Sequence, residues 1–191
     1  MKEKILFVNS CVRGENESRT LALAKTALSR LDGDIEEIRL ADANLKPLDA
    51  AGLAKRAESA EKNDFSDPVY DCAKQFAACD TVVIAAPFWD YSFPAFLKIY
   101  IESLCVGGLT FLYGSDGVPI SYCRAKRLIY ITTLGGYIDG TDFGFEYIKT
   151  VTKSFFGIEN FSFFSAEGLD ILGNDPAAIL KAAQEKIERE L

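Results

Sequence analysis

The segment Pro87–Pro94 concentrates four aromatic side chains between an apolar run and a helical pattern. They are Phe88, Trp89, Tyr91 and Phe93. In an open α/β sheet, such a strand-to-helix corner lies outside the carboxyl ends of the strands, where ligands bind. The aromatic rings therefore either frame a planar ligand or plug the top of the core, and the segment alone leaves both interpretations open.

A second candidate for ligand binding is the polar loop Ser10–Ser18, which follows an apolar strand pattern and opens a helical one. Backbone N–H groups and the positive end of the helix can hold an anion there, with Ser10, Asn16 and Ser18 as side-chain donors. The loop lacks the G-x-G-x-x-G and G-x-x-x-x-G-K-[ST] patterns of dinucleotide and ATP sites. Ser and Asn also cap ordinary helices, so this loop does not decide the matter by itself.

Charges of both signs lie in and beside this loop. Glu15 and Glu17 would repel a phosphate dianion, whereas Arg13 and Arg19 can compensate for that repulsion. The loop is therefore compatible with a phosphate group.

A third candidate is the run Thr132–Gly136, which ends a strand pattern with two glycines. Glycine lets backbone amides approach a ligand closely, although a tight turn with φ > 0 is an equally simple explanation of the pair. In a parallel sheet of order 2-1-3-4-5, the corners after the first, third and fourth strands meet at one edge. The joint occurrence of three such segments favours one shared ligand site.

The elements that must position these segments alternate between strand and helix patterns. Strands are predicted at 5–8, 35–40, 81–86, 127–133 and 160–165, and helices at 21–31, 50–61, 69–78, 95–104, 143–156 and 176–191. We expect Gly33 to stop the first helix, Val69, Ala73 and Phe76 to pack inward, and the Gly-rich stretch 107–123 to be irregular. The alternation predicts an α/β, flavodoxin-like three-layer sandwich, whose five-stranded parallel sheet of order 2-1-3-4-5 has helices on both faces and forms one domain over residues 1–191.

Composition excludes several classes of partner. The 191 residues carry a formal net charge of -7 and a pI of about 4.8, which opposes binding to nucleic acid or an anionic membrane. No secretory leader pattern and no apolar run of roughly 18 residues is visible, so we expect a cytoplasmic protein. A small-molecule ligand is favoured.

The five cysteines and the absence of histidine restrict the chemistry further. The cysteines are odd in number and show no CxxC spacing, so no disulfide framework, zinc site or iron–sulfur site is expected. Without histidine, the chain lacks the commonest general base and the commonest metal ligand. We therefore expect no metal.

Taken in order, the motifs of this chain resemble those of the FMN-dependent NADH azoreductases, within the flavodoxin-like NAD(P)H:quinone oxidoreductases. The resemblance covers nearly the whole chain and rests on Pro87–Pro94, Leu97-Lys98, Gly108–Phe111 with Tyr113, Thr133–Gly136, Phe156–Ile158 and Ala166–Gly168.

The resemblance implies bound FMN, NADH or NADPH as reductant, and a quinone or azo compound as acceptor, in a ping-pong hydride transfer without a side-chain acid or base. It also implies a homodimer with active sites at the subunit interface. The implied FMN-binding residues are Ser10, Asn16, Glu17, Ser18, Pro87, Phe88, Trp89, Asp90, Tyr91, Thr133, Leu134, Gly135 and Gly136, and the implied substrate-binding residues are Trp89, Phe111 and Tyr137.

Two positions depart from the family pattern. Asp90 stands where relatives usually carry Asn, and an ionised carboxylate near a flavin would oppose the negative charge of the reduced ring. Tyr137 follows the glycine pair where some relatives place His nearby. Substrate preference at that loop is therefore open.

Two other functions remain as alternatives at this stage. A flavodoxin-like electron carrier would bind FMN without turning over an organic substrate of its own, and the acidic charge fits such a carrier. A phosphodiesterase is disfavoured, because the chain has no histidine and no carboxylate cluster with metal-ligand spacing.

Overall fold

The centre of the fold is a sheet of five parallel strands in the order β2-β1-β3-β6-β7. It is seen in a computed structural model that describes residues 2–14, 16–140 and 142–191. The strands are β1 (Glu3–Asn9), β2 (Gly33–Arg39), β3 (Thr81–Ala85), β6 (Arg127–Thr133) and β7 (Asn160–Ala166). Numbered among themselves, they have the order 2-1-3-4-5, so the predicted topology is confirmed.

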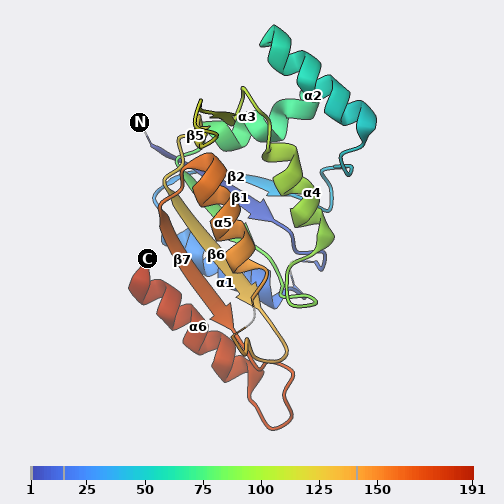
Figure 1. Ribbon diagram of the computed structural model, residues 1–191. Helices are drawn as coiled ribbons and strands as arrows, with labels where there is room; N and C mark the ends of the chain where they lie inside the picture. The colour runs from blue at the N-terminus through green and yellow to red at the C-terminus, as the bar shows by residue number, and fades with distance from the viewer. Residues whose placement is uncertain (1, 15, 141) are drawn as a thin grey trace.

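Helices cover both faces of this sheet (Figure 1). One face packs against α1 (Arg19–Ser29) and α6 (Pro176–Glu190). The other packs against α3 (Asp71–Ala78), α4 (Ala95–Leu104) and α5 (Phe145–Phe156). The remaining helix, α2 (Ala50–Lys62), stands beyond the end of the sheet and buries none of its residues.

The central strands alternate between two cores. Ile5 and Phe7 pack toward α1 and α6, whereas Leu6 and Val8 pack toward α4 and α5, and all four are almost completely buried. Burial on both faces explains why the central strands are continuous apolar runs. No helix in the described part of the chain is long and apolar enough to cross a membrane.

The prediction that Gly33 stops the first helix is wrong. Helix α1 ends at Ser29, and Gly33 is the first residue of β2. A Cβ at position 33 would lie 2.6 Å from the carbonyl oxygen of Glu3 and 2.6 Å from Cδ1 of Ile5. The glycine therefore allows β2 to lie close to β1.

The stretch 107–123 is more regular than expected. It contains an antiparallel hairpin of β4 (Phe111–Tyr113) and β5 (Pro119–Ser121), which lies near the amino end of the sheet. The amide of Arg124 just after the hairpin donates to the carbonyl of Ala77, close to the start of β3. Strands of three residues are too short for periodicity to reveal them.

Two helix starts also differ from the prediction. Residues Pro68–Tyr70 form a 3₁₀ turn, η1, and Val69 is exposed, whereas Ala73 and Phe76 of α3 are buried as predicted. Helix α5 begins at Phe145 and not at 143. The carboxylate of Asp142 accepts hydrogen bonds from two amides at this helix start and so sets its position.

Candidate functional site

A cavity of about 200 Å³ lies at the carboxyl ends of β1, β3 and β6. All three segments singled out in the sequence contribute to its wall. The lining residues are Cys11, Val12, Arg13, Glu17, Ser18, Arg19, Thr20, Pro87, Phe88, Trp89, Thr133, Leu134, Gly135 and Asp170. The structure thus brings the three corners to one site, as the topology requires.

The start of α1 forms the polar end of the cavity. Ser18 caps this helix, and its hydroxyl oxygen accepts from the amide of Leu21 at 3.2 Å. The hydroxyl proton of Ser18 is therefore left to donate to another group. The guanidinium groups of Arg13 and Arg19 and the positive end of the helix favour an anion here, whereas the carboxylates of Glu17 and of Asp170, which pairs with Arg19, oppose it.

Ser10 and Asn16 do not line the cavity. The Ser10 hydroxyl is buried and donates to the carbonyl of Ala85 at 3.0 Å, which ties β1 to β3. Asn16 is exposed beside Glu17. Glu15, expected to oppose an anion, lies outside the described residues.

The aromatic corner contains a tight turn. Trp89 and Ser92 exchange two backbone hydrogen bonds, of 3.0 and 2.7 Å, across Asp90 and Tyr91. Both central residues are left-handed, with φ of 50° and 63°, which is the geometry of a type I′ turn. Asp tolerates this conformation better than Tyr does. The turn places Asp90 and Tyr91 at its exposed tip, and neither lines the cavity.

The four aromatic side chains lie in three environments, one of which is the exposed tip of the turn, occupied by Tyr91. Phe88 and Trp89 line the cavity, and Trp89 is 44% exposed, so the interpretation of Trp89 as a plug of the core is wrong. Phe93 instead packs against the core and against the ring of Tyr147, at 5.7 Å between centroids. The plug interpretation therefore holds for Phe93.

Residues Leu134–Gly136, which follow β6 and are called the glycine loop below, are held by hydrogen bonds to the segment after β7. The carbonyls of Gly135 and Gly136 accept from the amides of Asp170 at 3.0 Å and Gly168 at 2.6 Å. Neither Gly135 nor Gly136 has a positive φ, so a turn that demands glycine for that reason is not the explanation of the pair. Within the described residues, the amides of these two glycines donate to no protein acceptor, which leaves both donors for a ligand.

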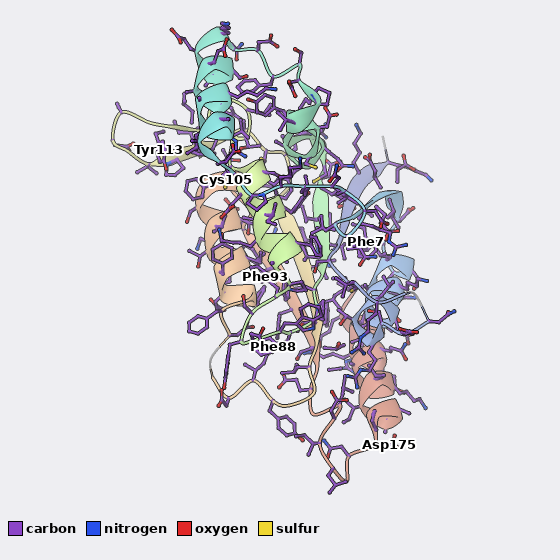
Figure 2. All side chains as sticks on the ribbon, turned by 90° about the vertical axis from the view of Figure 1, so that its right-hand side faces the viewer. Phe7, Phe88, Phe93, Cys105, Tyr113 and Asp175 are labelled. Carbon is purple, nitrogen blue, oxygen red and sulfur yellow. The ribbon has the colours of Figure 1, made fainter. Side chains whose placement is uncertain are left out.

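Two side chains predicted to bind substrate lie apart from the cavity. Phe111 of β4 packs edge to face on Phe155 at 4.8 Å, near the amino end of the sheet. Figure 2 shows the neighbouring Tyr113 and the cavity residue Phe88 far apart along the molecule. Tyr137 is exposed, and its hydroxyl accepts from the side-chain amide of Asn174 at 3.0 Å.

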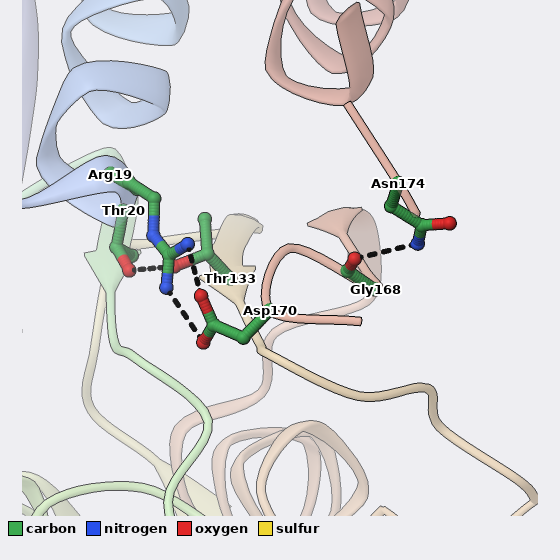
Figure 3. Close-up of polar contacts among 6 residues, drawn as sticks. All are labelled: Arg19, Thr20, Thr133, Gly168, Asp170 and Asn174. Carbon is green, nitrogen blue, oxygen red and sulfur yellow. Dashed lines mark hydrogen bonds and ion pairs between the residues drawn. The ribbon is translucent and has the colours of Figure 1, made fainter. Parts of the chain in front are cut away.

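Sequence reasoning missed Cys11, Val12, Thr20 and Asp170 as cavity residues. The hydroxyls of Thr20 and Thr133 share a buried hydrogen bond of 2.6 Å, and Asp170 pairs with Arg19 (Figure 3). Asp170 follows the last strand, whose carboxyl end opens on the same edge, so the topology offered a signal for it. The Cys11 thiol is almost completely buried, which raises its pKa and keeps the thiol protonated.

The arrangement suits an elongated ligand with an anion at one end and a planar ring at the other. The cationic helix start would hold the anion, and Phe88 and Trp89 would contact the ring. The free amides of the glycine loop can donate to acceptors on the ring edge. Among the described residues, no group of three or more metal-ligating side chains is present.

Comparison with known proteins gives a consistent result. Residues 3–191 match the model of a family described as having a flavodoxin-like fold. The chain is 34% identical over 207 aligned residues to the FMN-dependent NADH:quinone oxidoreductase 2 of Clostridium acetobutylicum, covering 98% of this chain and 97% of that protein.

Solved structures with the same fold include two from Bacillus anthracis. An azoreductase gives a TM-score of 0.82 at 21% identity, with 98% of this chain and 97% of that chain covered. An FMN-dependent NADH-azoreductase in complex with FMN gives a TM-score of 0.78 at 21% identity, with 99% and 97% covered.

Proposed function

This chain belongs to the flavodoxin-like family of FMN-dependent NADH:quinone oxidoreductases and azoreductases, and we propose that its cavity binds FMN for NADH-dependent reduction of quinones or azo compounds. The observation that carries the proposal is the convergence of a helix start with two arginines, two aromatic side chains and the free amide of Gly135 on one cavity, whose lining does not include Gly136. The nicotinamide of NADH, and after it the acceptor, would occupy the exposed side of the cavity beside Trp89.

The cavity residues fit FMN in their chemistry. The phosphate requires donors and positive charge, which the start of α1, the Ser18 hydroxyl, Arg13 and Arg19 supply. An alanine side chain at Gly135 would collide with the carboxylate of Asp170, so the glycine makes room for that residue in the wall of the cavity. The planar ring system requires apolar faces, which Phe88 and Trp89 supply.

Bound FMN supplies a two-electron carrier that accepts hydride from a nicotinamide and passes it to a second substrate. The chain contributes position and electrostatics. Trp89 bounds the slot that nicotinamide and acceptor share in turn, and so holds each near the reacting ring. The amide of Gly135 would donate to the ring edge and stabilise negative charge there. The proton for the reduced product can come from water, so the reaction does not need a histidine.

The proposal predicts that the purified protein retains FMN and oxidises NADH when a quinone such as menadione is added. An absorption spectrum after incubation with FMN and gel filtration measures retention, and the decrease of absorbance from NADH measures turnover. A protein that stays colourless contradicts the cavity assignment. A yellow protein without quinone-dependent NADH oxidation would instead be an electron carrier.

We also propose that the chain forms a homodimer. The hairpin of β4 and β5 exposes an unusual density of apolar side chains for a monomer surface, at Leu112, Tyr113, Val118, Ile120 and Tyr122. Phe111 lies too far from the cavity of its own chain to contact substrate there. Phe111 is itself buried in the core, so the exposed side chains of the hairpin are the ones that would meet a second copy.

The dimer proposal predicts a species of twice 21.0 kDa in solution. Light scattering at micromolar protein concentration measures the mass directly. Replacing Tyr113 and Ile120 with serine is expected to shift the equilibrium toward monomer, because it removes apolar area from the contact. A parent protein that runs only as a 21.0 kDa monomer would rule out the dimer.

The acidic charge and the five free cysteines fit a reducing cytoplasm, where NADH is available. We propose NADH over NADPH, since no basic patch for a 2′-phosphate stands out in the sequence.

A further inference from the structure

An ion pair joins the first and last segments of the cavity wall. Arg19, the first residue of α1, donates through Nη1 to Oδ1 of Asp170 at 2.8 Å and through Nη2 to Oδ2 at 3.1 Å (Figure 3). Two parallel hydrogen bonds fix the relative orientation of the two planar groups as well as their distance. The pair therefore holds the loop after β7 against the start of α1.

Asp170 is also seated on the glycine loop. Its amide donates to the carbonyl of Gly135 at 3.0 Å, and its Oδ2 lies only 2.5 Å from the place that a Cβ of Gly135 would occupy. One residue thus touches the glycine loop with its backbone and its side chain while pairing with Arg19. The position of Gly135 is linked through Asp170 to the helix start that faces the anion.

A second contact joins α1 directly to the end of β6, where the glycine loop begins. The hydroxyls of Thr20 and Thr133 share a buried hydrogen bond of 2.6 Å directly beside the ion pair (Figure 3). The amide of Leu169 also donates to the carbonyl of Leu134 at 3.2 Å. Both ends of the glycine loop are therefore fixed relative to α1.

The charge and exposure of the pair agree with a positioning role. The hydrogen bond from Arg19 lowers the pKa of the Asp170 carboxyl, so Asp170 is ionised at neutral pH. The side chains of Arg19 and Asp170 are 33% and 63% exposed, and ion pairs at such exposure add little to folding stability. The geometry of the cavity wall is what the pair affects most directly.

We propose that Asp170 is a positioning residue that, clamped by Arg19, sets the glycine loop at the spacing from α1 that a bound flavin requires. This inference rests on the proposed function. It assigns to Arg19 a structural partner in addition to its charge near the phosphate. It also makes the position of Gly135 at the ring end of the cavity depend on the contacts that Asp170 makes with it.

The test uses Asp170→Asn, which keeps the shape but removes the negative charge and replaces one of the two acceptor oxygens with a donor NH₂. It also uses Arg19→Lys, which keeps the charge but removes the two-pronged geometry. The matched control is Arg124→Lys, because Arg124 pairs with Asp80 at the same 2.8 Å but at the amino end of the sheet. Quenching of flavin fluorescence gives the Kd of each apoprotein for FMN and for riboflavin.

Asp170→Asn and Arg19→Lys are each expected to raise the Kd for FMN about tenfold, whereas Arg124→Lys is expected to keep the Kd of the parent protein. Asp170→Asn is expected to raise the Kd for riboflavin by the same factor, because positioning of the glycine loop does not involve the phosphate. The double variant is expected to be no worse than either single variant. The inference is overturned if Asp170→Asn leaves FMN binding unchanged or tighter, or weakens FMN but not riboflavin.

Hydrogen exchange of the apoprotein separates this inference from the proposed function. Peptides covering residues 167–171 are expected to exchange faster in both clamp variants than in the parent and in Arg124→Lys, because the amides of Gly168, Leu169 and Asp170 bond to the glycine loop. A parent that binds no flavin would refute the proposed function alone. Unchanged exchange in both clamp variants would refute the clamp, and Arg19→Lys carries this comparison if Asp170→Asn does not fold.

Discussion

Trp89→Ala is expected to raise the Kd for FMN about 30-fold, a loss of about 2 kcal/mol, from one aromatic contact and the apolar area buried with it. It is also expected to slow reduction by NADH and reoxidation by a quinone, since both partners would use the slot that Trp89 bounds. Stopped-flow absorbance of the flavin measures the two half-reactions separately. Folding stability is expected to change little, because the side chain is 44% exposed.

A suitable control for this variant is Phe143→Ala. Phe143 is 65% exposed, and its amide donates to the carbonyl of Tyr91 in the same turn, but its side chain does not line the cavity. Equal effects of the two substitutions would mean that Trp89 acts through the turn and not through contact with the flavin. A lower melting temperature with unaltered kinetics would likewise argue against the proposed role.

Gly135→Ala is expected to weaken FMN binding by about 2 to 3 kcal/mol, which is a rise of about 30- to 150-fold in Kd. The loss comes from displaced packing and from breaking the ion pair between Arg19 and Asp170. The added Cβ would stand 2.5 Å from Oδ2 of Asp170 and 3.1 Å from its Cβ and Cγ. The carboxylate cannot keep its place beside Arg19 and accommodate this atom as well. Titration of the apoprotein with FMN gives the loss, and urea unfolding shows whether stability accounts for it.

The adjacent glycine provides the comparison. A Cβ at Gly136 would meet nothing within 4 Å, so Gly136→Ala adds the same methyl group without the collision. It is expected to weaken FMN binding far less than Gly135→Ala does. Similar losses at both positions would indicate that the loop needs glycine for flexibility and not for the space that Asp170 occupies.

Most of the fold was predictable because its central strands are buried on both faces. Strands β1, β3 and β6 are continuous apolar runs for that reason, whereas β4 and β5 have three residues each and leave no periodic pattern. The role of Gly33 was misjudged because close contact between β2 and β1 is a tertiary requirement. A glycine after a helical pattern looks the same in the sequence whether it ends that helix or starts a strand.

The site was predictable at the level of segments and less so at the level of side chains. Topology alone places the three corners together, but the type I′ turn determines that Trp89 lines the cavity and that Asp90 and Tyr91 lie at the tip. Ser10 illustrates the same limit, since its hydroxyl is used between two strands. The pairing of Arg19 with Asp170 joins residues 151 positions apart, and no local pattern marks it.

That long separation has a consequence for how the protein acquires its cofactor during synthesis. The cavity wall draws on residues from Cys11 to Asp170 of a 191-residue chain, and the glycine loop is hydrogen-bonded to the segment that follows the last strand. A nascent chain that has emerged only as far as β6 has the helix start proposed to hold the phosphate and the Thr20–Thr133 contact, but it lacks the segment after β7 that hydrogen-bonds to the glycine loop. We therefore expect capture of flavin to be a late event, after translation is nearly complete, and we expect truncated chains released by the ribosome not to sequester the cofactor.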